Sequence, residues 1–141
     1  MALNSTQLDI FGKTLSIMAE FKKGFGRNLG ADIIAEIYVA KELDLDFPNE
    51  VNKPGYDLYA ENGAQYQVKY REKDTLNVDT NNFDFDFLVV VNLDNNFNLD
   101  GMWIMAESQA KAIFSKREKY NKFQVTQKKF AEEDKYERSG K

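Results

Sequence analysis

Apolar positions recur at helical spacing near the beginning of the chain. Over residues 5–23 they repeat every three or four residues, which indicates an amphipathic helix. Ser5 or Thr6 is expected to cap this helix, and the glycines that follow it are expected to end it. A second helix is predicted over residues 29–43, where a wide apolar face favours packing against a sheet. The positions that define the two faces are Leu8, Phe11, Leu15, Met18 and Phe21, then Ile33, Ile34, Ile37 and Tyr38.

The pattern changes to strands after the two helices. Residues 56–60 and 65–71 alternate between apolar and polar around Asn62-Gly63, a dipeptide that favours a β-hairpin. The run FLVVV inside residues 83–92 is typical of a strand buried on both faces. The remaining predicted elements are a turn at residues 94–96 that leads to a short strand, a further strand over residues 102–105, a helix over 108–120 and a short strand over 122–126.

This order of elements predicts an α/β fold with a central mixed sheet of four to five strands flanked by helices. With 141 residues, no internal repeat and no linker, the chain is expected to form one domain. We assign residues 1–25 to an extra N-terminal helix, 26–126 to the core and 127–141 to a charged helix or tail.

Composition restricts the chemistry that the chain can perform. It has no histidine and no cysteine, which excludes the usual zinc sites, thiol nucleophiles and histidine-based acid–base catalysis. Any catalysis must therefore use carboxylates, lysines, hydroxyls and cations that prefer oxygen ligands. Because the sequence contains neither a cleavable signal peptide nor an apolar run of membrane-spanning length, we expect a soluble, cytoplasmic protein with no membrane partner.

The net charge of −4 is unevenly distributed along the chain. Residues 111–129 hold seven Lys or Arg and one acid, Glu118, whereas residues 42–50 hold four acids and no base. A nucleic acid responds to the local field rather than to the net charge of the protein. The basic segment is therefore compatible with a binding face, and also with an ordinary solvated surface.

Strand alternation gives the predicted hairpin one polar face. Side chains point alternately to the two faces of a strand, so Gln67 and Lys69 share one face. Tyr66, Val68 and Tyr70 share the other face and suit a core. The amide and the amine are therefore expected to converge on the side opposite that core.

The turn decides whether Asp57 lies on the same face. If the Asn-Gly pair formed a two-residue turn, Asp57 would pair with Val68 and point to the apolar face. If residues 61–63 form a three-residue loop with Gly63 left-handed, Asp57 lies opposite Gln67. We expect the three-residue loop, or an equivalent bulge near Asp57.

A glutamate on a helix, an aspartate before a hairpin and a Gln-x-Lys strand follow one another along the chain. They are Glu36 in AEIYVAKEL, Asp57 in PGYDLY, and Gln67 and Lys69 in QVKYR. This arrangement resembles the PD-(D/E)xK nuclease superfamily, which has the restriction-endonuclease-like fold, and in particular its small bacterial single-domain members. The resemblance covers residues 26–72 and extends loosely beyond them.

The resemblance implies a Mg²⁺-dependent site, with Mn²⁺ as a substitute. Asp57 would be the principal ligand of the ion, joined by the Gln67 amide oxygen and the Val68 backbone carbonyl. Lys69 would orient or deprotonate the attacking water and offset the charge of the phosphate. Glu36 would hold a metal-bound water or a second ion.

The implied activity is endonucleolytic hydrolysis of phosphodiester bonds in DNA, in restriction or another defence system. The chain departs from the family pattern at two positions. Gln67 stands where an acid is more usual, and Ala35 precedes Glu36 where related domains often have glycine. The missing negative charge lowers the expected metal affinity. It keeps open an alternative, a catalytically inactive relative that binds nucleic acid or another protein.

Five basic residues are candidate contacts to DNA phosphates. They are Arg71, Lys73, Lys116, Lys119 and Lys122. A protein with one active site per chain can cut both strands of a duplex only as a dimer or by two sequential nicks. The length of the chain also leaves little room for a specificity domain. A homodimer or a targeting partner protein is therefore considered.

Overall fold

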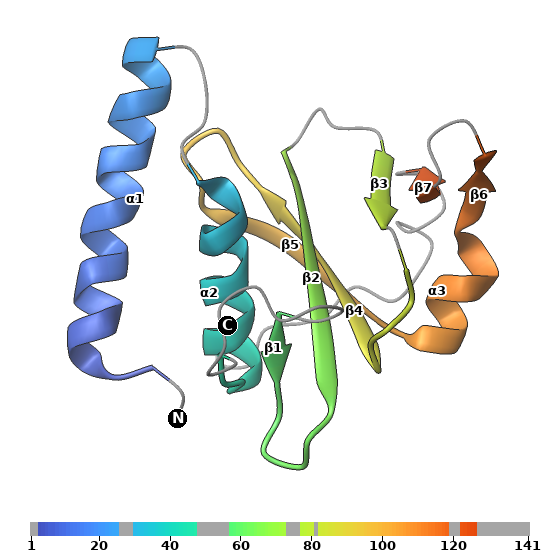
Figure 1. Cartoon of the computed structure of the whole chain (residues 1–141). Coiled ribbons are helices and arrows are strands. Elements are labelled where there is room, and N and C mark those ends of the chain that lie inside the picture. Colours follow the sequence, from blue (N-terminus) through green and yellow to red (C-terminus); the bar gives the residue numbers. More distant parts are fainter. Residues whose placement is uncertain are drawn as a thin grey trace.

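Helices and sheets form layers in the computed structural model of the chain (Figure 1). α1 and α2 lie on one side of a four-stranded sheet, and α3 lies with a smaller sheet on the other side. The structure describes residues 3–25, 30–47, 57–72, 77–80, 82–118 and 122–126. The helices and the mixed sheet of this part confirm the predicted α/β class.

The first helix, α1, spans Ser5–Phe25, close to its predicted limits. Its cap is Asn4 rather than Ser5 or Thr6. The Asn4 side chain accepts a hydrogen bond from the Gln7 N–H (2.9 Å), and the Gln7 side chain accepts one from the Asn4 N–H (2.9 Å). The helix continues past the first glycine that was expected to end it. None of the helices in the described ranges combines the length and apolar character needed to cross a membrane.

The second helix, α2, spans Ala31–Leu43 and packs on the central sheet. The predicted start at residue 29 lies outside the described residues. The helix ends at Asp44, which adopts a left-handed conformation (φ 55°), and the Leu45 N–H returns to the Ala40 carbonyl (3.0 Å). Its buried residues are Ala31, Ile34, Ala35, Tyr38, Val39 and Ala40.

The central sheet has the strand order β1-β2-β4-β5. β2 and β4 are parallel, whereas the two outer pairs are antiparallel. The strands are β1 (Leu58–Tyr59), β2 (Gln65–Glu72), β4 (Phe87–Leu93) and β5 (Leu99–Ala106). β4 therefore begins later than predicted. The strand predicted over residues 102–105 is longer and begins directly after the β4–β5 turn.

β4 is buried on both faces, as the run FLVVV predicted. Val89 and Val91 pack in a core with α1 and α2. Leu88 and Val90 pack in a second core with α3. The sheet thus separates two apolar cores, and at one of its edges the short β1 pairs with only the first residues of the longer β2.

The C-terminal part differs from the prediction. The helix predicted over residues 108–120 is only α3 (Glu107–Ile113), because Phe114 is buried in the second core with an extended backbone (φ −80°, ψ 137°). The following residues form a strand in a separate sheet, which contains β3 (Asn77–Thr80), β7 (Lys122–Thr126) and β6 (Ser115–Arg117). The sequence pattern did not predict β3 or β6. The predicted tail over residues 127–141 lies outside the described residues.

Candidate active site

The hairpin between β1 and β2 has the three-residue loop that was expected. The Ala60 N–H donates to the Ala64 carbonyl (2.9 Å), and Gly63 adopts a left-handed φ of 88°. The regular pairing ends at Leu58 and Tyr66, and the Asp57 N–H also donates to the Tyr66 carbonyl (2.9 Å), as at a β-bulge. The Asp57 carboxylate accepts a hydrogen bond from the Gln67 side chain, so the prediction that Asp57 lies on the polar face of the hairpin is confirmed.

The Asp57 side chain is held at the start of β1. Its Oδ2 accepts hydrogen bonds from the Val68 N–H (2.9 Å) and from Nε2 of Gln67 (3.1 Å). Its own N–H donates to the Tyr66 carbonyl (2.9 Å). The carboxylate thus takes the place of a main-chain acceptor where the pairing of β1 with β2 ends, and its position relative to β2 is fixed.

Gln67 and Lys69 point to the face of the sheet that carries α3. In the parallel ladder Gln67 lies beside Leu88, and Lys69 lies beside Val90. Both β4 residues belong to the core on the α3 side, whereas Val68 is buried on the α2 side. This confirms the predicted alternation along β2, but Tyr70, which was expected in the core with Val68, is 37% exposed.

The Val68 carbonyl points to the same edge of β2 as Asp57. The N–H and C=O of one strand residue point to the same side of the strand. Because the Val68 N–H donates to Asp57, the Val68 carbonyl also lies on the β1 side of β2. A carboxylate oxygen and a main-chain oxygen are therefore available along one sheet edge.

Glu36 on α2 contributes a second carboxylate to this region. It is partly buried, and its pKa is raised from 4.5 to about 7. Burial is the main cause of this pKa shift, followed by repulsion from Asp57 and Asp32. The electrostatic influence of Asp57 means that α2 brings Glu36 close to the hairpin, although the two residues are well separated in sequence.

The pKa of Asp57 is also raised, mainly by burial and further by Asp32. The Val68 N–H and the charge of Lys69 oppose this change and lower the pKa of Asp57. Lys69 is therefore close enough to Asp57 to stabilise its charged form. Asp57 thus lies among two other carboxylates and one ammonium group.

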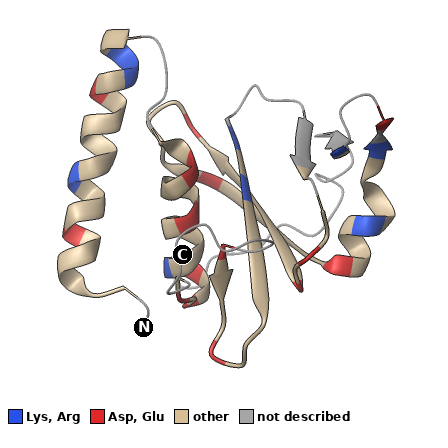
Figure 2. Ribbon diagram, in the orientation of Figure 1, with Lys and Arg blue, Asp and Glu red and all other residues tan. Residues whose placement is uncertain are grey.

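Asp32 was not predicted as part of the site. It lies four residues before Glu36, so the two carboxylates occupy adjacent turns of α2. Figure 2 shows acidic segments along α2 beside basic segments of β2. The spacing of four residues was the available sequence signal for Asp32.

The donors around Asp57 fit a hard cation that retains part of its water shell. No three Asp, Glu, His or Cys side chains in the described part of the chain form a group that could hold a metal ion. The available oxygens belong to the Asp57 carboxylate, the Val68 carbonyl and the Gln67 amide, with Glu36 nearby. Gln67 now directs its nitrogen to Asp57, so the amide must turn to present its oxygen. Mg²⁺ accepts few protein ligands together with several waters.

The candidate DNA contacts have different surroundings. Arg71 is only 3% exposed, so it is not the open phosphate contact that its place beside Lys69 suggested. Lys116 is exposed, and its Nζ lies 6.0 Å from the centre of the Phe123 ring. Lys122 is partly buried on β7. Lys73 and Lys119 lie outside the described residues.

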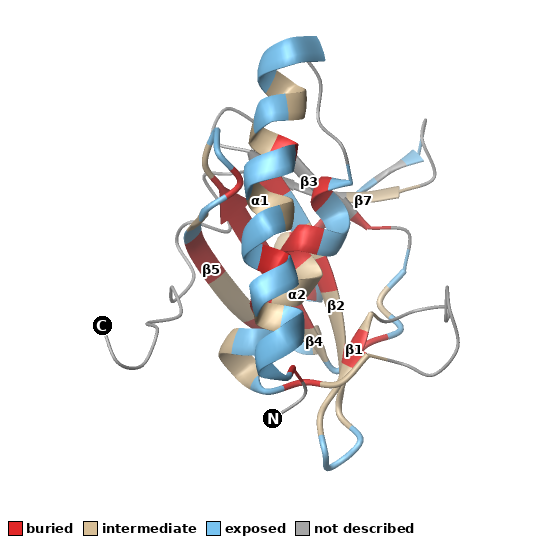
Figure 3. Cartoon of the chain, turned by 90° about the vertical axis from the view of Figure 1, so that its left-hand side faces the viewer, coloured by how far each residue is buried: buried red, intermediate tan, exposed pale blue. Residues whose placement is uncertain are grey.

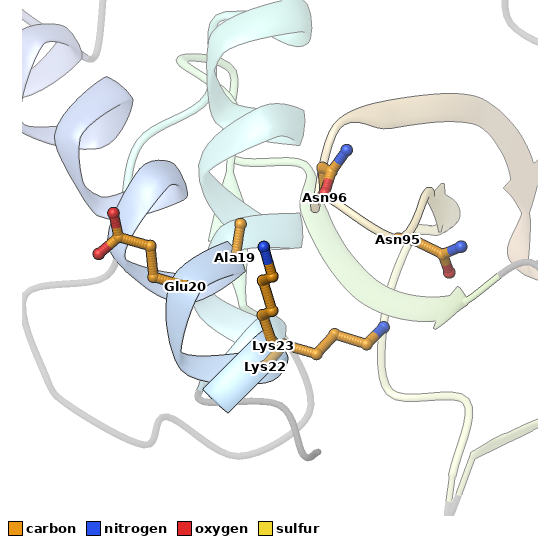
Figure 4. Close-up of a pocket in the computed structure, with 6 residues that line it drawn as sticks. All are labelled: Ala19, Glu20, Lys22, Lys23, Asn95 and Asn96. Carbon is orange, nitrogen blue, oxygen red and sulfur yellow. The ribbon is translucent and has the colours of Figure 1, made fainter. Parts of the chain in front are cut away.

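A shallow groove lies elsewhere, between the end of α1 and the β4–β5 turn (Figure 4). It has a volume of about 340 Å³. Its lining residues are Ala19, Glu20, Lys22, Lys23, Asn95 and Asn96. Lys22 lies 5.5 Å from the centre of the Phe97 ring, which packs under this turn. None of the residues of the Asp57 region lines this groove, so we do not assign it to the candidate active site.

The candidate active site therefore consists of Glu36 from α2, Asp57 from the hairpin, and Gln67 and Lys69 from β2. One hydrogen bond, from Gln67 to Asp57, and two electrostatic influences connect them, and the Val68 N–H also donates to Asp57. Protein-family models and curated protein sequences were both compared with this chain, and neither comparison found a match.

Proposed function

We propose that the Asp57 region is the active site of a Mg²⁺-dependent endonuclease that hydrolyses phosphodiester bonds in DNA, with a restriction-endonuclease-like core. The observation that carries this proposal is the fixed Asp57 carboxylate, which shares a sheet edge with the Val68 carbonyl. Glu36 and Lys69 add a further acid and a base at this edge. A role in restriction or another defence system follows from the resemblance alone.

The carboxylates are suited to holding a cation near a phosphate. Bound Mg²⁺ would stabilise charge on the scissile phosphate and lower the pKa of a coordinated water. Asp57 supplies the principal ligand oxygen, with Gln67 and Val68 as neutral donors. Glu36 holds water on the α2 side. A nearby cation also offsets the repulsion that raises the pKa of Glu36.

Lys69 has a separate role in this proposal. It lies on the same face of β2 as Gln67 and is close enough to Asp57 to lower the pKa of that carboxyl. From this position its ammonium group orients the attacking water and offsets the negative charge that develops on the phosphate. A lysine is needed there because the chain has no histidine.

The DNA is proposed to approach from the α3 side of the sheet. Gln67 and Lys69 point to this side, and the second sheet with Lys116 and Lys122 also lies there. Aromatic rings beneath Lys111 and Lys116 orient their ammonium groups through cation–π contacts of 5.9 and 6.0 Å. Lysines on this surface would attract the phosphate backbone without reading its sequence.

One observation favours a second candidate function. The Gln67 amide already satisfies Asp57 with a hydrogen bond, so the pair needs no cation to be stable. A relative that has lost catalysis but still binds nucleic acid or a partner protein would show such a pair. The two functions are separated by whether DNA is cut or only bound.

The proposal is tested by incubating plasmid and single-stranded DNA with the protein, in the presence of Mg²⁺, Mn²⁺ or a chelator. We expect cleavage with either cation and none with the chelator. Asp57→Ala and Lys69→Ala should each reduce the rate at least about 100-fold, as expected for groups that act on the reacting atoms.

Two exposed residues supply matched controls for this experiment. Asp84→Ala removes a carboxylate from the loop before β4, and Lys41→Ala removes a lysine from the last turn of α2. Both control variants should cut DNA at the wild-type rate. Binding without cleavage would favour the second candidate function. Cleavage that survives both site substitutions would refute the assignment.

A further inference from the structure

α1 has a second apolar stripe that faces away from the sheet. Phe11 and Met18 are buried against the body of the protein. Ile10, Ile17 and Phe25 are 56%, 59% and 71% exposed. Figure 3 shows the outer side of α1 as largely exposed along its length. Ile10 and Ile17 share one side of the helix, whereas Phe25 lies about 80° around the axis from that side and stacks on Phe21 (4.6 Å between ring centres). The two exposed isoleucines indicate an interaction surface.

The stripe has a regular geometry. Ile10, Ile17 and Gly24 are seven residues apart, which is close to two helical turns, so they lie in one line along α1. Gly24 is bare, because no atom lies within 4 Å of the position that a Cβ would occupy there. The line therefore has large side chains at one end and an open space at the other.

Charges of opposite sign border this line on one side. Lys13 follows Ile10 by three residues, and Glu20 follows Ile17 by three residues. Both side chains are exposed, and Lys13 has a solvent-exposed ion pair with Asp9 at 3.2 Å. Lys13 and Glu20 thus place opposite charges on this side of the stripe, and Lys13 also pairs with Asp9 of its own helix.

We infer that this face of α1 binds α1 of a second copy of the chain in an antiparallel arrangement. In an antiparallel pair, residues on one border of the first helix contact residues on the same border of the second helix, in reversed order. Lys13 then lies opposite Glu20 of the second copy, and Glu20 lies opposite Lys13 of that copy. Ile17 lies beside the two-fold axis, and Ile10 covers Gly24 of the second copy.

The charge order selects this partner and this orientation. In a parallel pair this border would face the opposite border of the second helix, which holds Thr14 and Phe21, so Lys13 and Glu20 would have no charged partner there. The antiparallel pair brings together opposite charges at two symmetry-related positions and matches a large side chain to a bare glycine. Such self-complementarity is the requirement of a two-fold interface between identical subunits.

This inference is independent of the proposed function, since it uses no residue of the Asp57 region. It also gives the proposed nuclease two active sites per assembly. Two sites related by a two-fold axis match the two strands of a duplex, which are themselves antiparallel.

The test is sedimentation equilibrium of the full chain over a range of concentrations, without DNA or divalent cations. Wild-type protein should show a reversible monomer–dimer equilibrium, and Ile17→Asp should be monomeric. Glu20→Lys replaces two attractive pairs with two repulsive ones and should raise the dimer dissociation constant at least about tenfold. The double variant Lys13→Glu/Glu20→Lys restores opposite charges and should return that constant to within about threefold of wild type.

Circular dichroism of each variant checks that α1 remains folded. Lys41→Glu, a charge reversal on α2, is the matched control and should dimerise like wild type. A wild-type protein that is monomeric at every concentration would overturn the inference. So would a dimer that survives Ile17→Asp, or a double variant that associates no better than Glu20→Lys.

Discussion

Nε2 of Gln67 donates a hydrogen bond of 3.1 Å to Oδ2 of Asp57. The same carboxylate oxygen accepts the Val68 N–H, so both of its partners lie on β2. In the nuclease pattern that the sequence resembles, an acid is more usual at the position of Gln67. The neutral amide therefore replaces a like-charge contact with a favourable one, which stabilises the site at the expense of charge available for a cation.

The Gln67→Glu variant should be less stable than wild type and should bind a cation more tightly. The new carboxylate would lie beside Asp57, and the two charges would repel each other when no cation is bound. We expect the variant to be less stable than wild type by about 1–3 kcal/mol at neutral pH without divalent ions. Its affinity for Mg²⁺ should rise about tenfold or more, because cation affinity increases with the number of charged ligands. Urea unfolding and isothermal titration calorimetry measure the two effects.

The Gln67→Met variant separates the effect of an added charge at position 67 from the effect of losing the hydrogen bond to Asp57. It removes the donor to Asp57 with a side chain of similar length and adds no charge. This variant should lose stability without gaining Mg²⁺ affinity. Equal affinities for Mg²⁺ in wild type, Gln67→Met and Gln67→Glu would show that position 67 does not face the cation.

Asp57→Asn should abolish stabilisation of the folded protein by divalent cations. A ligand that binds only the folded state raises the free energy of unfolding by about 2.7 kcal/mol at 100 times its dissociation constant. We expect wild-type protein to gain this stability in Mg²⁺ or Mn²⁺, and Asp57→Asn to gain none. Thermal unfolding with and without cation is the measurement. Asp84→Asn, at an exposed carboxylate, should respond like wild type.

Glu36 should make the protein less stable as the pH rises. Its pKa is about 7 in the folded state against an ordinary value of 4.5, so the folded state holds the proton more tightly than the unfolded state. The free energy of unfolding should therefore fall between about pH 4.5 and pH 7, by about 1–2 kcal/mol from this group, because solvent screening at the partly exposed carboxyl reduces the effect of the pKa shift. Above that range the charged Glu36 carboxylate remains a destabilising group.

Glu36→Gln should remove this part of the pH dependence. The variant should be more stable than wild type at pH 8, and the two should differ little at the acidic end of the range. Urea unfolding at a series of pH values provides the comparison. A wild-type protein whose stability rises with pH over the same range, with Glu36→Gln parallel to it, would contradict the assigned cause.

The hairpin and its polar face were predictable because they depend on local rules. An Asn-Gly pair, a period of two and one candidate loop length were enough to place the Asp57 and Gln67 side chains on the same face. The N-terminal cap of α1 also depends on nearby residues, but the cap is Asn4 rather than Ser5 or Thr6. Asn4 is favoured because Gln7 exchanges hydrogen bonds with it.

Three other features of the fold depend on tertiary packing and could not be predicted from local sequence patterns. Phe114 ends α3 because its side chain fills the core on the α3 side of the sheet, although the sequence would support a longer helix. Burial of Arg71 arises in the same way, since alternation along β2 gives its direction but not what covers it. The polar strand β3 has no periodic pattern and forms by pairing with β7.

Gly63→Ala should destabilise the hairpin by about 1 kcal/mol. Gly63 has a left-handed φ of 88°, a conformation in which a Cβ is unfavourable. Gly12→Ala is the matched control, because Gly12 lies inside α1 with open space around it. That substitution should raise stability by up to about 1 kcal/mol. Chemical denaturation of the two variants should therefore give changes of opposite sign.

The position of a bound cation is the most direct test of the proposed active site. Mn²⁺ broadens NMR signals of nearby nuclei, so a titration of ¹⁵N-labelled protein locates it. The account predicts that the amide signal of Val68 broadens at lower Mn²⁺ concentrations than that of Gly12 on α1, and that Asp57→Asn abolishes this difference. A Val68 signal that stays sharp while surface amides of α1 broaden would contradict the account.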